Sequence, residues 1–120
     1  MLDFEALQRL GLDTGEGLAC CADDAEFYVE MLAEYVTEAQ ERAAQLREFF
    51  EGADWKNYGI RAHAVKSTSR MIGALALSER AKELELAAKA GDTETVRAAH
   101  APFLEAYEAL AAAIGGLLEG

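Results

Sequence analysis

Apolar side chains recur three and four residues apart along most of this chain, and this spacing constrains the fold more than any other feature. The longest run lies in residues 28–50, at Tyr28, Leu32, Tyr35, Ala39, Ala43, Leu46 and Phe50. Residues at this spacing share one face of an α-helix, whereas a half-buried strand needs strict alternation. The single proline and the lack of alternating β-branched residues agree with this pattern. The sequence therefore predicts an all-α protein.

The first half of the chain divides into a short and a long predicted helix. The short helix is expected over residues 3–10, because the glycine-rich residues 11–17 stop it, and a loop should follow. Asp23 with Glu26 three residues later is an N-terminal capping signature. It should open the long helix, which Gly52 ends.

Three more helices follow. Asp54 can cap the first of them, which ends at Gly73, and the second should cover residues 75–90. Asp92 can cap the last, in which Pro102 predicts a kink or break. The residues expected to face inward in these last two helices are Leu77, Ala81, Leu84, Ala88, Val96, Ala99, Phe103, Leu110 and Ile114. Together the segments predict an antiparallel up-down-up-down four-helix bundle with a short extra N-terminal helix.

Size, charge and cysteine content exclude several other classes of protein. A chain of 120 residues and 13.0 kDa is expected to form a single domain over residues 1–120. No 18-residue apolar run or basic signal sequence is found, so we expect a cytoplasmic monomer without membrane contact. A net charge of -11 weighs against nucleic acid as a partner. Cys20 and Cys21 are adjacent and supply too few ligands for a zinc site, so we expect inert thiols and no metal.

The segment over residues 62–74 carries the polar residues that indicate a function. On a helix, one face would hold Gly59, His63, Lys66, Ser67 and Arg70. The opposite face would hold Tyr58, Ala62, Val65, Ser69 and Ile72. The apolar spacing of this opposite face suits a bundle core, so the first face should point to water. The second histidine, His100, lacks such neighbours and is expected at the surface or the bundle edge.

The surroundings of His63 favour the approach of an anion on another protein. Gly59 and Ser67 are weak helix formers one turn on either side, and their small size would let a partner backbone come close. Residues 55–78 contain four basic residues and no acidic one, although the chain as a whole is strongly acidic. A histidine in such a field favours a phosphoryl group or an acidic partner pocket.

This pattern resembles the histidine-containing phosphotransfer (HPt) domain family of two-component phosphorelays. The motif of that family is His-x-x-Lys-Gly followed at a fixed distance by Gly-Ala. His63 and Lys66 match its first positions and Gly73-Ala74 its last, whereas Ser67 stands where the family most often has glycine. The likeness spans roughly residues 20–114, and its motif region over residues 54–92 includes Trp55, Tyr58, Leu84-Glu85 and Gly91-Asp92.

The resemblance implies a relay function. His63 would take a phosphoryl group from the aspartyl phosphate of a receiver domain and pass it to the aspartate of another receiver. Lys66 and Arg70 would offset charge on the phosphoryl oxygens. The implied partners are response-regulator receiver domains and a hybrid histidine kinase, with Mg²⁺ needed only in the receiver and no cofactor in this chain. The residues expected to support docking are Gly59, Ile60, Ser67 and Met71, with the alternative that Ile60 and Met71 belong to the core.

Three alternatives bear on this interpretation. The sequence has no Walker or kinase motif, so we expect no ATP-dependent kinase activity of its own. A metal-carboxylate bundle enzyme needs Glu-x-x-His pairs, but positions 60 and 97 hold Ile and Arg. A helical module that binds and inhibits a receiver or histidine kinase without being phosphorylated stays open. Both a free-standing shuttle and a domain of a larger kinase fit the sequence.

Overall fold

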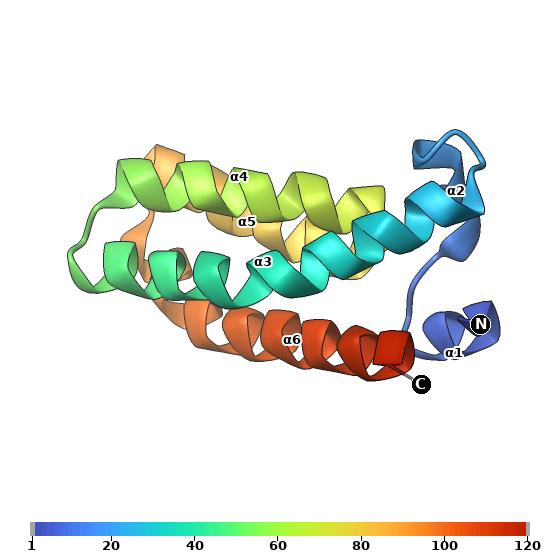
Figure 1. The fold of residues 1–120 in the computed structure, drawn as a ribbon. Helices are drawn as coiled ribbons and strands as arrows, with labels where there is room; N and C mark the ends of the chain where they lie inside the picture. The colour runs from blue at the N-terminus through green and yellow to red at the C-terminus, as the bar shows by residue number, and fades with distance from the viewer. Residues whose placement is uncertain (1, 120) are drawn as a thin grey trace.

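The computed structural model describes residues 2–119, and this part of the chain forms six α-helices and no strand. The helices are α1 (Phe4–Arg9), α2 (Thr14–Cys20), α3 (Ala25–Glu51), α4 (Trp55–Met71), α5 (Leu75–Ala90) and α6 (Thr93–Glu119). Helices α3 to α6 run antiparallel in sequence order, and α1 and α2 lie at the end of the bundle where α6 finishes (Figure 1). The predicted four-helix bundle with an extra N-terminal helix is confirmed.

Capping residues set most helix ends where the sequence predicts them. The Asp54 carboxylate accepts a hydrogen bond from the Asn57 amide at the start of α4, and Asp92 does the same for the Thr95 amide in α6. Helix α5 ends at Gly91, whose φ of 72° lies in the left-handed region. These caps give α4 and α5 the lengths that bring their middles together.

One predicted cap is wrong by one residue. The side chain of Asp24 accepts hydrogen bonds from the Glu26 and Phe27 amides at 3.0 and 3.2 Å, so Asp24 caps α3. Asp23 precedes it with a φ of 59°, in the left-handed turn that joins α2 to α3. The short side chain of an aspartate tolerates this backbone conformation.

The loop predicted after α1 is also wrong, because residues 14–20 form α2. The Asp13 carboxylate caps it by accepting from the Glu16 amide at 3.0 Å. Gly17 is buried on α2, where a Cβ atom would come within 2.4 Å of the Tyr28 ring. Glycine weakens an isolated helix, but here it permits close packing on α3, and that packing overrides the local propensity.

The core of the bundle is built from the predicted inward faces, with His100 as an exception to the predictions. His100 is 8% exposed, and its Nδ1 lies 2.8 Å from the Tyr58 hydroxyl. Its ring stacks on Phe50 with centroids 3.8 Å apart, and burial lowers its pKa. The spacing of Val96, His100 and Phe103 places it on the inward face, so the surface position expected for it is wrong.

Helix α6 departs from two expectations. It continues through Pro102, which lies on the exposed side, so of the predicted kink or break the break does not occur, and the kink stays a prediction. Within residues 2–119, α6 alone is long and apolar enough to span a membrane by length and composition, contrary to the expectation of no such run. Its large apolar residues, among them Phe103 and Ile114, are buried in the bundle, and 28% of the apolar stretch as a whole is buried.

Candidate functional site

His63 lies in the middle of α4, and 55% of its side chain is exposed. The face opposite to it is buried as predicted, at Tyr58, Ala62, Val65, Ser69 and Ile72. The Ser69 hydroxyl on this inner face lies 2.8 Å from that of Tyr35 on α3, whereas Thr68 donates to the Ala64 carbonyl of its own helix at 3.1 Å. The helix is therefore fixed on the core by its inner face, and His63 projects from the outer one.

A buried glutamate on α5 holds the histidine ring. Glu85 is only 4% exposed at its side chain, and its Oε2 lies 2.8 Å from His63 Nδ1. Lys66 Nζ lies 2.9 Å from Oε1, and Lys89 Nζ lies 2.8 Å from Oε2. Three donors thus converge on one carboxylate at the α4–α5 contact.

These contacts fix the ionisation state of Glu85. Burial by itself would raise the pKa of the carboxyl group, but hydrogen bonds from Lys89, Lys66 and His63 outweigh burial and lower the pKa to about 2. An ionised carboxylate can only accept hydrogen bonds, so His63 Nδ1 must carry the proton that lies between them. In the neutral ring the lone pair is then on Nε2, the nitrogen turned away from Glu85.

Glu85 and Lys89 were not among the predicted site residues. The sequence nevertheless carries a signal for both. Glu85 directly follows Leu84 on a face of α5 whose other buried members are apolar apart from Ser78, and a lysine stands four residues later. A glutamate at an inward position requires a cationic partner, and an i,i+4 lysine is one of the commonest.

The other predicted residues lie in different surroundings. Arg70 and Ser67 are exposed, Ile60 is 50% exposed, and Met71 is half-buried. Gly59, predicted on the exposed face, is instead buried against α5, where an added Cβ atom would lie 3.7 Å from that of Ala88. Helix α5 covers this end of the face, so only the part from Ile60 to Arg70 is open.

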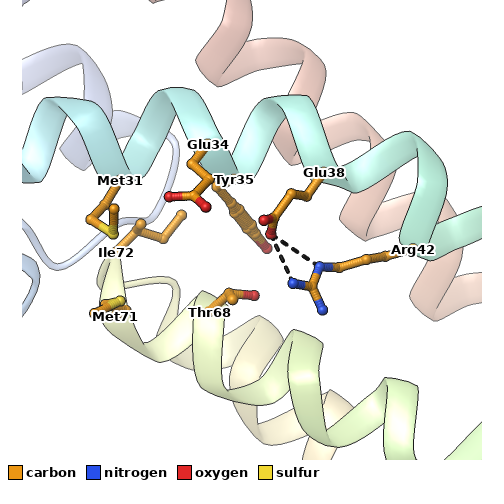
Figure 2. A pocket seen from close by; sticks show the side chains of 8 residues that line it. All are labelled: Met31, Glu34, Tyr35, Glu38, Arg42, Thr68, Met71 and Ile72. Carbon is orange, nitrogen blue, oxygen red and sulfur yellow. Dashed lines mark hydrogen bonds and ion pairs between the residues drawn. The ribbon is translucent and has the colours of Figure 1, made fainter.

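A hollow lies between α3 and the last turns of α4, and Figure 2 shows the side chains that line it, Met71 among them. It encloses about 200 Å³ between side chains of α3 and the last turns of α4. The Arg42–Glu38 ion pair, 2.8 Å between Nη2 and Oε2, borders it, as Figure 2 shows. No group of three His, Cys, Asp or Glu side chains in residues 2–119 is placed to hold a metal ion, and both cysteines are free thiols.

The fold and the site together define a class: a small helical bundle that presents one exposed histidine, oriented by a buried carboxylate and flanked by lysines. Residues 30–116 match the Hpt domain family, and the chain belongs to that family. It is a histidine phosphotransfer protein of two-component phosphorelays, a family whose members carry phosphoryl groups between receiver domains and kinases.

Two solved structures are similar to this one. The HPT domain of a sensor hybrid histidine kinase from Shewanella superposes with a TM-score of 0.81 at 16% identity, covering 92% of this chain and 95% of its own. Histidine-containing phosphotransfer protein B from Pseudomonas aeruginosa PAO1 gives 0.76 at 22% identity, covering 88% of this chain and 91% of its own. At these identities they establish the fold. No curated protein matches the sequence.

Proposed function

We propose that His63 is the residue that carries the phosphoryl group, and that Nε2 is the atom that accepts it. The hydrogen bond of 2.8 Å from Nδ1 to Glu85 carries this proposal. It leaves the lone pair on Nε2 and points that nitrogen away from the bundle, toward an incoming protein. The other histidine, His100, has its Nδ1 on Tyr58 and is buried beneath the ring of Phe50.

The transfer step balances as follows. The Nε2 lone pair attacks the phosphorus atom of an aspartyl phosphate on a receiver domain. The N–P bond forms as the bond between phosphorus and the aspartate oxygen breaks, and that electron pair returns to the aspartate carboxylate. Because Nδ1 keeps its proton, the ring becomes positively charged during the step. The ionised Glu85 lies against this charge and stabilises it. The reverse attack by the carboxylate of another receiver discharges His63.

Two cations are placed to act on the phosphoryl oxygens. Lys66 is 28% exposed and lies one turn from His63, bonded to Glu85 Oε1 in the unphosphorylated protein. A phosphoryl dianion on Nε2 would compete with Glu85 for this ammonium group, and we assign Lys66 to that role. Arg70 forms no ion pair within the described residues and lies exposed one turn further on, where it can meet the receiver.

The receiver supplies what this site lacks. We assign the Mg²⁺ of the reaction to the acidic pocket of the receiver, because no cluster of metal ligands lies beside His63 in the described chain. Phosphate would originate in a kinase and pass through this protein, which acts as a cytoplasmic monomer without nucleotide chemistry of its own. Ile60, Ser67 and Met71 are the docking residues of this proposal, and Gly59, buried in the α4–α5 contact, is not.

The test is transfer of label from a phosphorylated receiver. Wild-type protein should gain label that is lost in acid and kept in base, as expected for a phosphorus–nitrogen bond. His63→Gln should gain none, while retaining the helical content and melting temperature of the wild type. Label that persists in His63→Gln would remove His63 from this role. Binding to receivers without label in the wild type would favour the inhibitory module instead.

A further inference from the structure

A second hollow lies on the exposed side of α4, beyond the histidine. It is a shallow, open hollow of about 400 Å³, lined by Cys20 from α2 and by Ser67, Thr68, Arg70 and Met71 from α4. Ser67 is one helical turn from His63, and Met71 is two turns away. The hollow therefore opens on the same face as the candidate phosphorylation site.

The two walls of this hollow are held in a fixed relation. The Asp13 amide donates to the Gly73 carbonyl at 2.8 Å, and the Tyr28 hydroxyl donates to the Ile72 carbonyl at the same distance. Gly73 has a φ of 85°, and an added Cβ atom would lie 2.1 Å from the Asp13 carbonyl oxygen. With Gly17 packed on the Tyr28 ring, these contacts fasten α2 to the end of α4. The hollow is preformed, since neither wall can move without breaking buried contacts.

A receiver that reacts with His63 must cover this hollow. A protein interface of ordinary size covers about 800 Å² on each partner, equivalent to a disc with a radius of about 16 Å. Met71 is eight residues from His63, which is about 12 Å along a helix axis. If the receiver left the hollow empty, the residues that line the hollow would lose the dispersion contacts that close packing supplies. A receiver side chain that fills the hollow is therefore favoured.

The lining indicates what would fill it. Met71 gives an apolar and adaptable wall, and Cys20 adds a small, weakly polar one. Arg70 is exposed at the rim and has no carboxylate partner in the described residues, within the stretch of α4 that carries only basic charges. An apolar side chain next to a carboxylate would satisfy both features, because the apolar group fills the hollow and the carboxylate pairs with Arg70.

We infer that the hollow between α2 and α4 is a specificity pocket that accepts an apolar side chain, flanked by an acidic one, from the receiver domain that docks on His63. The inference rests on the proposed function. Helix α2 lies outside residues 30–116, the part that matches the family model, so this wall of the pocket can differ between members of the family and select among receivers.

The experiment compares two phosphoryl donors. Phosphoramidate is a small donor that needs no docking surface, whereas the phosphorylated receiver domains encoded in the same genome need one. For each protein, the transfer rate from each receiver is divided by the rate from phosphoramidate. Cys20→Trp would place an indole in the hollow, and Ala19→Trp is the matched control, since Ala19 is exposed on the same helix and does not line the hollow. Melting curves verify that both variants are folded.

We expect the ratio to fall at least tenfold in Cys20→Trp for the receiver that wild type prefers, and to stay within twofold in Ala19→Trp. Alkylating the exposed Cys20 of the wild-type protein with a bulky maleimide should give the same fall without a substitution, because Cys21 is fully buried. Equal ratios in wild type, Cys20→Trp and alkylated protein would overturn this inference alone. Failure of the wild-type protein to accept label from any receiver would overturn the proposed function.

Discussion

Replacing Glu85 by glutamine should slow transfer about tenfold while leaving the bundle folded. The amide oxygen can still accept a hydrogen bond from the Nδ1–H group of His63, so the change removes charge and largely preserves shape. Two unit charges 2.8 Å apart interact by about 1.5 kcal/mol when fully screened by water and by about 6 kcal/mol at an effective dielectric constant of 20. Because His63 is half-exposed and Lys66 and Lys89 already offset the Glu85 charge, the screened limit applies. It corresponds to about tenfold in rate.

The assay is single-turnover transfer from a phosphorylated receiver, combined with ¹⁵N NMR of the imidazole ring. In wild type the NMR spectrum at neutral to mildly alkaline pH should report protonated Nδ1 and unprotonated Nε2. Glu83→Gln is the matched control, since Glu83 is an exposed glutamate on the same helix and should transfer at the wild-type rate. A wild-type rate in Glu85→Gln, or a ring with its proton on Nε2 in wild type, would refute the role of Glu85.

Three further predictions concern stability. Because the pKa of Glu85 is lowered from its ordinary 4.5 to about 2, its ionised form stabilises the fold above pH 4.5, and this stability is lost as the pH falls toward 2. On acidification, the free energy of unfolding measured by denaturant titration should fall by about 2 kcal/mol less in Glu85→Gln than in wild type, after allowing for solvent screening. Equal losses of unfolding free energy would contradict the pairing of Glu85 with its cationic partners. Gly59→Ala should raise the free energy of unfolding by up to about 1 kcal/mol, since the methyl group fits against Ala88 and alanine favours the helix. A destabilised variant would contradict this fit, and a stable variant that transfers poorly would restore a docking role to Gly59. Gly73→Ala should lower the free energy of unfolding by about 1–3 kcal/mol, and with it the melting temperature, because of the positive φ of Gly73 and the approach of the Asp13 carbonyl. An unchanged melting temperature would show that α2 is not fastened there.

Local patterns were sufficient to predict the bundle. The three-four spacing from Tyr28 to Phe50 and the caps at Asp54 and Asp92 specify helices through contacts between near neighbours in the chain. Such signals can be detected in one sequence because each depends on residues within about one turn of each other. The length of α5, residues 75–90, followed from Gly91 in the same way.

The predictions that proved wrong concern places where contacts between distant segments of the chain determine the structure. Helix α2 forms because Gly17 lets it pack on Tyr28, a contact that glycine content alone argues against. His100 is buried because residues of two other helices contact it: the Tyr58 hydroxyl forms a hydrogen bond with its ring, and the Phe50 ring stacks on it.

At the site, spacing along α4 placed His63 and Lys66 on one face, but it could not show that α5 brings Glu85 beneath them. It also placed Gly59 on the open face, because the course of α5 across α4 depends on the packing of the whole bundle.

The central claim is that His63 carries the phosphoryl group on Nε2, and ³¹P–¹⁵N correlation NMR of protein phosphorylated by a receiver tests it most directly. We predict one phosphorus signal coupled to the Nε2 of His63, with Nδ1 still hydrogen-bonded to Glu85, and no signal in His63→Gln. A signal coupled to Nδ1, or one that survives in His63→Gln, would contradict the claim.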